Sequence, residues 1–146
     1  MKRIIILMFF TGLLFVSCRF LDDGITIPIN LKCDKNIVVD EIKYNQISTN
    51  NYGITNVVLN GDCLEVTISS SGCDPNGWMM SLVASENVVE TLPIQQNIKV
   101  ELINNQYCLA VFKKIVSFDL TSIQNTGQNQ VLLNIDGWNT PILYQY

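Results

Sequence analysis

The sequence predicts an all-β domain, an antiparallel β-sandwich or small barrel of about eight strands, stabilised by disulfides. Short apolar runs recur along the chain with turn residues between them, and no stretch has the period of a full-length amphipathic helix. The second observation is that four cysteines follow an export signal: Cys33, Cys63, Cys73 and Cys108. An even number of cysteines in an exported chain is typical of a disulfide framework.

Residues 1–17 have the anatomy of a lipoprotein signal peptide. Lys2 and Arg3 precede an apolar stretch at residues 4–16, and Ser17 is the small residue expected before a cleavage point. The stretch is shorter than the about 20 apolar residues of a membrane-spanning helix. We therefore expect residues 1–17 to be removed, residues 18–31 to form a lipidated tether, and residues 32–146 to form a single β-sandwich domain.

Cys18 is the expected lipidation site. Phe15-Val16-Ser17-Cys18 resembles the lipobox of bacterial lipoproteins, although Phe15 departs from the usual Leu, Val or Ile. Each buried methylene of an acyl chain, palmitate for example, contributes about 0.8 kcal/mol to membrane binding. We expect a lipid anchor at the outer membrane, with the periplasmic or cell-surface face left open. An ordinary secretory signal peptide that happens to end near a cysteine is the alternative.

The composition excludes several classes of function. Histidine is absent, which removes the commonest general base and every imidazole zinc site. Nine basic residues stand against thirteen acidic ones, so no basic surface for nucleic acid is expected. No phosphate-binding or nucleophile-elbow motif is present. We expect a chain that is not an enzyme and that uses no cofactor.

The first strands are expected soon after residue 32. Residues 36–44 read NIVVDEIKY, and residues 54–59 lead through Asn60-Gly61 into an alternating run at residues 63–69. Asn-Gly between two such runs is the strongest short hairpin signal, because both residues tolerate the positive φ of a type I′ turn.

The later strands follow the same pattern of apolar runs. Runs at residues 78–84 and 97–103 are followed by the turn-prone pair Asn104-Asn105, with the next strand expected from Gln106. That run is one bent strand or two, and Lys113-Lys114 marks a bulge or a sheet edge. A helical turn is expected at residues 121–125, and the last two strands at residues 130–135 and 141–146.

The four cysteines allow three pairings. Cys63 and Cys73 stand at opposite ends of an expected strand, too far apart to be joined. We favour the pairs Cys33 with Cys63 and Cys73 with Cys108. Free buried thiols or a four-thiolate metal site are the alternatives, but no C-x-x-C spacing supports a metal.

The loop SSSGCDPNGW, residues 69–78, is the most conspicuous candidate site. Asp74 and Asn76 offer oxygens of the kind that calcium binds, but the other acids of a calcium loop are missing. A β-turn capped by Asp74 is the simpler interpretation, and we predict no metal site.

Trp78 and Trp138 each follow a turn glycine and are candidate ligand platforms. An exposed indole beside Asp and Asn suits the stacking of a sugar ring. A tryptophan that begins a strand is more often part of the core.

Three pairs of carboxylates are candidates for acid-only glycosidase chemistry. Such a pair must lie about 5 to 9.5 Å apart across a cleft, and most surface carboxylates instead cap turns or face solvent. The pairs are Asp40 with Glu41, Asp62 with Glu65, and Glu86 with Glu90.

Several stretches together resemble small uncharacterised lipoproteins of Bacteroidota, including the NigD-like group. They are LEVTISSSGC at residues 64–73, the strand with Tyr107-Cys108, and VSFDLTSI at residues 116–123 before a final strand that ends in Tyr146. The resemblance covers residues 60–146 and implies the fold, the location and a bridge between Cys73 and Cys108, but no activity. Pro75-Asn76-Gly77-Trp78 replaces the His and acidic residues that often follow the Gly-Cys in those relatives.

The expected function is that of an outer-membrane-anchored lipoprotein that acts as a non-enzymatic binding or assembly module. Its partners are the membrane, through the lipid anchor, and a protein or glycan, without nucleic acid. A small inhibitor of host or rival hydrolases is the first alternative, with the CDPNGW loop as its contact. An acid-only glycosidase is the second.

Overall fold

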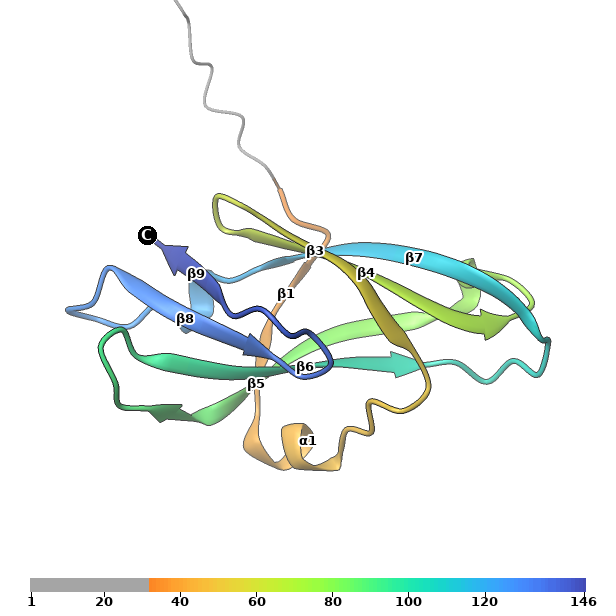
Figure 1. Ribbon diagram of the computed structural model, residues 1–146, viewed down its shortest axis with the longest axis horizontal. Helices are drawn as coiled ribbons and strands as arrows, with labels where there is room; N and C mark the ends of the chain where they lie inside the picture. The colour runs from red at the N-terminus through yellow and green to blue at the C-terminus, as the bar shows by residue number, and fades with distance from the viewer. Residues whose placement is uncertain (1–31) are drawn as a thin grey trace, which may run out of the picture.

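The computed structural model describes residues 32–146, so Cys18 and the expected signal peptide and tether lie outside the described residues. Within this range nine strands form two sheets that pack face to face, which confirms the β-sandwich (Figure 1). One sheet has the order β1-β7-β4-β3, and the other has the order β2-β5-β6-β8-β9. No helix in the described range is long and apolar enough to cross a membrane.

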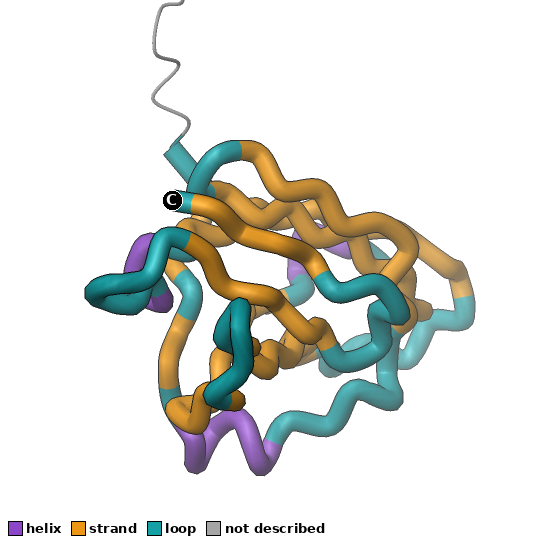
Figure 2. The backbone as a smooth tube through the Cα atoms, turned by 60° about the vertical axis from the view of Figure 1, so that its left-hand side comes forward, coloured by secondary structure: helices purple, strands orange, loops and turns teal. Residues whose placement is uncertain are grey.

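The strands are β1 (Lys35–Asn36), β2 (Val38–Val39), β3 (Gly53–Asn60), β4 (Cys63–Gly72), β5 (Met79–Val89), β6 (Gln95–Ile103), β7 (Ala110–Asp119), β8 (Gln130–Ile135) and β9 (Ile142–Gln145). Between residues 32 and 146 the remaining elements are one α-helix, α1 (Glu41–Gln46), and two short 3-10 helices, η1 (Pro75–Gly77) and η2 (Thr121–Ile123). Figure 2 shows how little of the described part of the chain is helical.

The core is built from the inward side of each alternating strand. In β8 every second residue is buried, and the same period holds through most of β6. The largest fully buried side chains are Tyr144 and Phe118, one from each sheet. The alternation that predicted the strands therefore also identifies the core face.

Residues 35–39 cross from one sheet to the other, which corrects the strand expected at residues 36–44. β1 pairs with β7, β2 pairs with β5, and the buried Ile37 between them marks the crossing. Asp40 then ends the extended segment, because its carboxylate accepts the Lys43 N–H at 2.8 Å and caps α1. The helix packs against β5.

The predicted hairpin between β3 and β4 is confirmed, but its turn is one residue later than expected. Asn60 pairs with Cys63, so Gly61 and Asp62 are the two turn residues. Of these two residues, only Gly61 has a positive φ, of 56°. A positive φ at the first turn residue alone belongs to the type II′ class and not to type I′.

The β7 segment is a single strand that starts at Ala110, later than expected. Its pairing with β4 runs without a register shift, so Lys113-Lys114 does not mark a bulge. The opposite side of β7 pairs with β1 only at Phe118 and Asp119, so the lysines lie on a sheet edge.

The sheets are mixed rather than wholly antiparallel. The pairs β1 with β7, β2 with β5, and β6 with β8 are parallel. None of these pairs is joined by a hairpin, so hairpin geometry does not impose an antiparallel direction on them.

Candidate functional site

The end of the sandwich where β4 finishes and β7 begins is held by a disulfide. Cys73 and Cys108 are joined there, with a Cα–Cα distance of 4.9 Å. At the other end of β4, Cys63 is joined to Cys33, with a Cα–Cα distance of 5.6 Å. These are the two pairs favoured from the sequence. We call residues 72–79 and 103–111 together the clamped end.

Gln106 organises the loops of the clamped end. Its side-chain oxygen accepts hydrogen bonds from the Cys73 N–H at 2.7 Å, the Asp74 N–H at 3.0 Å and the Trp78 indole N–H at 3.2 Å. Its amide nitrogen donates to the Asp74 carbonyl at 2.8 Å. One side chain therefore replaces the strand pairing that stops at Gly72 and fixes the CDPNGW loop.

Trp78 belongs to the core, which corrects its candidacy as a ligand platform. The side chain is 2% exposed, and its only polar atom is bonded to Gln106. A Cβ on Gly72 would come within 2.8 Å of the indole nitrogen, so only glycine allows this close approach.

Asp74 and Asn76 serve the loop itself. The Asp74 carboxylate accepts the Asn76 N–H at 2.9 Å and caps η1, while both residues are exposed. The carboxylate therefore performs the turn-capping role predicted as the simpler interpretation. Among the described residues no group of three or more acids and cysteines is placed to hold a metal ion.

Large apolar side chains are exposed at the clamped end. Tyr107 is 97% exposed and Leu109 is 91% exposed, although the disulfide at Cys108 fixes the segment between them. Three further apolar residues are exposed at the adjoining strand ends: Met79 and Ile103 on the outer face of the five-stranded sheet, and Val111 on the outer face of the four-stranded sheet. Met79 and Ile103 are direct neighbours in the pairing of β5 with β6. Sequence reasoning missed these exposed side chains, although Tyr107 and Leu109 flank a predicted disulfide cysteine.

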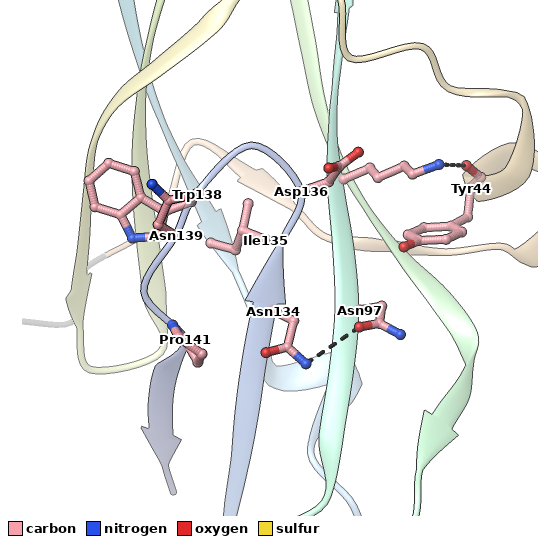
Figure 3. Close-up of a pocket in the computed structure, with 9 residues that line it drawn as sticks. Tyr44, Asn97, Asn134, Ile135, Asp136, Trp138, Asn139 and Pro141 are labelled. Atoms are coloured by element: carbon pink, nitrogen blue, oxygen red, sulfur yellow. Dashed lines mark hydrogen bonds between the residues drawn. The ribbon is translucent and has the colours of Figure 1, made fainter.

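A second feature is a cleft of about 390 Å³ on the outer side of the five-stranded sheet, which we call the outer cleft. Figure 3 shows Tyr44 on one side, Trp138 and Pro141 on the other, and Asn97 and Asn134 between them. The remaining lining residues are Lys99, Ile135, Asp136 and Asn139. Trp138 is partly buried and packs against the core, so it contributes to the fold as well as to the lining of the cleft.

The charged groups of the outer cleft are tied to neighbouring groups. The Lys99 ammonium donates to the Tyr44 carbonyl at 3.2 Å and lies 4.5 Å from the centre of the Tyr44 ring. The Asp136 carboxylate accepts the Thr49 hydroxyl at 3.1 Å. Burial, together with the negative charges of Asp136 and Glu41, raises the pKa of the Tyr44 phenol, which stays neutral at physiological pH.

Two of the three carboxylate pairs have a member engaged in a structural hydrogen bond. Asp40 caps α1, and Asp62 accepts the Tyr144 hydroxyl at 2.6 Å. A hydrogen bond from the Ser85 hydroxyl holds the pKa of Glu41 below its ordinary value of 4.5. A general acid requires the opposite shift, so this arrangement opposes glycosidase chemistry at that pair.

Comparison with known proteins identifies structures that share the fold of this chain. No protein-family model matches the chain, and no curated protein matches it. Solved structures with the same fold include a DUF1344 protein of unknown function from Bacteroides vulgatus, with 19% identity, a TM-score of 0.53, and coverage of 77% of this chain and 56% of that one.

Two further structures are similar to the same degree. A putative toxin-related protein from Parabacteroides distasonis has 14% identity and a TM-score of 0.52, over 77% of this chain and 59% of that one. A NigD-like immunity protein from Bacteroides caccae has 12% identity and a TM-score of 0.53, over 75% and 56%. This chain spans less than two thirds of each neighbour. The resemblance to the NigD-like group is therefore confirmed at the level of the fold.

Proposed function

We propose that this chain is an outer-membrane lipoprotein whose domain binds a protein partner without catalysing a reaction. The observation that carries the proposal is the clamped end, where five large apolar side chains are exposed on a rigid frame. Tyr107 and Leu109, two positions apart on a disulfide-held segment, are the most exposed of these side chains, and exposed apolar surface of this kind is typical of protein-binding sites. A disulfide also reduces the entropy lost when such a surface binds. Tyr107 is of the residue type that contributes most at interfaces.

The absence of histidine and the structural use of Asp40, Glu41 and Asp62 support a role in binding rather than catalysis. The signal peptide and Cys18 support the membrane location, since acyl chains on a processed cysteine would hold the domain at a bilayer.

The anchor is tested with Cys18→Ala in the native host. We expect the variant to lose incorporation of labelled palmitate and to move from the membrane fraction to the soluble fraction. Unchanged partitioning, or an unmodified amino terminus found by mass spectrometry of the wild-type protein, would overturn the anchor.

The binding surface is tested by crosslinking in intact cells. A photoreactive residue replaces Leu109 at the clamped end or, as the matched control, Ile42, which is also apolar and is 74% exposed on α1. We expect a discrete crosslinked protein from position 109 that is missing from position 42, and we expect Tyr107→Asp to reduce its yield. Equal yields from both positions would contradict the proposal.

A second candidate is a small inhibitor of host or rival hydrolases. The CDPNGW loop favours it, because Gln106 and the Cys73–Cys108 bridge hold an exposed loop in one conformation. One structural neighbour carries the name of an immunity protein, which is a statement about that protein. Retention of the purified chain on immobilised lysozyme or proteases would support the inhibitor, and no retention would remove it for those enzymes.

A further inference from the structure

The outer cleft has a wall of aromatic or cyclic side chains on either side. Tyr44 is carried by α1, whereas Trp138 and Pro141 are carried by the loop between β8 and β9 (Figure 3). The loop is held in place because the Asp136 N–H donates to the Ile98 carbonyl at 2.9 Å and the Trp138 N–H donates to the Ile135 carbonyl at 3.0 Å. The two walls are therefore positioned by the backbone of the sheet.

The floor of the outer cleft presents amide groups. Asn97 and Asn134 are direct neighbours in the parallel pairing of β6 with β8. The Asn134 amide nitrogen donates to Gln95 at 2.9 Å and to the Asn97 side-chain oxygen at 3.4 Å. Among the hydrogen bonds of residues 32–146, the Asn134 side-chain oxygen, the Asn97 amide nitrogen and the Asn139 amide have no protein partner. An acceptor, the Asn134 side-chain oxygen, and a donor, the Asn97 amide nitrogen, thus lie on the two far sides of this hydrogen-bonded pair (Figure 3).

The charges of the outer cleft do not select an ion. Its lining includes one ammonium group, that of Lys99, and one carboxylate, that of Asp136. The ammonium group is already bonded to the Tyr44 carbonyl, and the carboxylate is bonded to Thr49. The two formal charges of the lining residues are of opposite sign and sum to zero, so the cleft has no net charge that would favour an anionic or a cationic ligand.

We infer that the outer cleft binds a neutral saccharide. A pyranose ring has C–H groups on its faces and hydroxyls around its rim, which match apolar walls and an amide floor. A volume of about 390 Å³ lies at the lower end of the range for small-molecule pockets. The cleft shares no residue with the clamped end, so this inference is independent of the proposed protein contact.

The test titrates the purified protein with the methyl glycosides of glucose, galactose, mannose and N-acetylglucosamine. Tryptophan fluorescence is the readout, because Trp138 lines the cleft whereas Trp78 is buried and gives a constant background. Saturation-transfer NMR provides an independent measure of contact. We expect saturable binding of at least one glycoside with a Kd on the order of 1 mM.

Variants assign the binding to the cleft. Asn134→Ala and Asn97→Ala should each weaken the affinity by about tenfold, while Asn76→Ala, an exposed asparagine at the clamped end, should leave it unchanged. Circular dichroism verifies that each variant is folded. The inference is overturned if no glycoside gives saturable binding at concentrations up to 50-fold above about 1 mM. It is also overturned if Asn134→Ala and Asn97→Ala bind like the wild type, or if galacturonate binds more tightly than the neutral glycosides.

Discussion

At the scale of single residues, Gln106 is the side chain on which the clamped end depends most. It bridges the Cys73, Asp74 and Trp78 segments through four hydrogen bonds. Removing it would leave the buried Trp78 indole N–H without an acceptor, and an unsatisfied buried donor costs about 1–3 kcal/mol.

We therefore predict that Gln106→Ala lowers the free energy of unfolding by about 2–3 kcal/mol, measured by urea denaturation. Gln128→Ala is the matched control, since Gln128 is exposed in the loop before β8. Equal unfolding free energies for the two variants would show that the Gln106 bonds contribute nothing net.

The lowered pKa values of two carboxylates, Asp34 and Asp119, indicate how the stability of the fold depends on pH. Hydrogen bonds from the Ser117 N–H and hydroxyl hold the pKa of Asp34 below 3.8, and bonds from the Thr121 hydroxyl and N–H do the same for Asp119. Because the folded pKa values are depressed, the stabilisation is complete above the unfolded pKa and is lost as the pH falls through the folded values.

We predict that the urea midpoint is level near neutral pH and falls between about pH 5 and pH 2. The double variant Asp34→Asn, Asp119→Asn should have a flatter acid limb than the wild type. Glu90→Gln, at an exposed position, should not change the slope. A double variant with the wild-type slope would refute the assignment to these two groups.

The roles of residues could be predicted from the sequence where the role depends on neighbours in the chain or on the length of a strand. Strand length excluded a bridge between Cys63 and Cys73, and the favoured pairs were one of the two pairings that remained. Asp74 as a turn cap followed from its place before Pro75. Gln106 was not predicted, because its partners are backbone groups and one indole N–H about 30 positions away, and no periodicity encodes such contacts. Trp78 stayed ambiguous because a strand-initial indole is either core or surface until the fold decides.

At the scale of elements, the outer edge of β5 is protected by lysines from the other sheet. The Lys35 ammonium donates to the Met80 carbonyl at 2.7 Å, and the Lys114 ammonium donates to the Trp78 and Pro75 carbonyls at 2.5 and 2.9 Å. β2 covers only two residues of this edge, at Val83 and Ala84. The lysines thus occupy carbonyls that a further strand would otherwise use.

We predict that Lys114→Met lowers the free energy of unfolding by about 2 kcal/mol, because bonds to a charged donor contribute about 1.5–3 kcal/mol. Lys113→Met is an adjacent control, since Lys113 is exposed on the same strand. Denaturation and light scattering report stability and self-association. A loss in Lys113→Met as large as that in Lys114→Met would contradict the role of the edge contact.

The strands themselves were predictable and α1 was not. Alternation in β4, β6 and β8 carries the information on which face is buried. Residues 36–44 were expected as one strand because β-branched residues dominate their first half. The signal for α1 was Asp40 followed by Glu41, an N-cap with an acid in the first turn.

At the scale of the whole molecule, the order of the strands in the two sheets could not be predicted from the sequence. Hairpin signals connect neighbours in the chain, so β3 with β4 was predicted, whereas the parallel pairs β1 with β7 and β6 with β8 join distant segments. Their pairing is decided by which apolar faces bury each other across the sandwich. The outer cleft depends on the pairing of β6 with β8. The sequence therefore identified Trp138 as a candidate, but it could not identify the residues that line the cleft beside it.

The fold places the start of the domain and the clamped end at opposite ends of the four-stranded sheet (Figure 1). The Cys33–Cys63 bridge ties the first described residues to the start of β4, while the clamped end lies beyond Gly72, where β4 stops. Ten strand residues separate the two, about 30 Å at the usual rise. An anchor at Cys18 would therefore leave the clamped end further from the bilayer on average.

This arrangement predicts a gradient of distance from the membrane. A fluorescent residue replaces Asn60, beside the β3–β4 turn, or Asn105, at the clamped end, in lipidated protein reconstituted into vesicles whose headgroups carry an energy-transfer acceptor. We expect greater transfer from position 60, because transfer falls steeply over distances comparable to the length of β4. Loss of transfer from both positions in Cys18→Ala controls for the anchor. Equal transfer from the two positions in anchored protein would show that the clamped end is not held away from the bilayer.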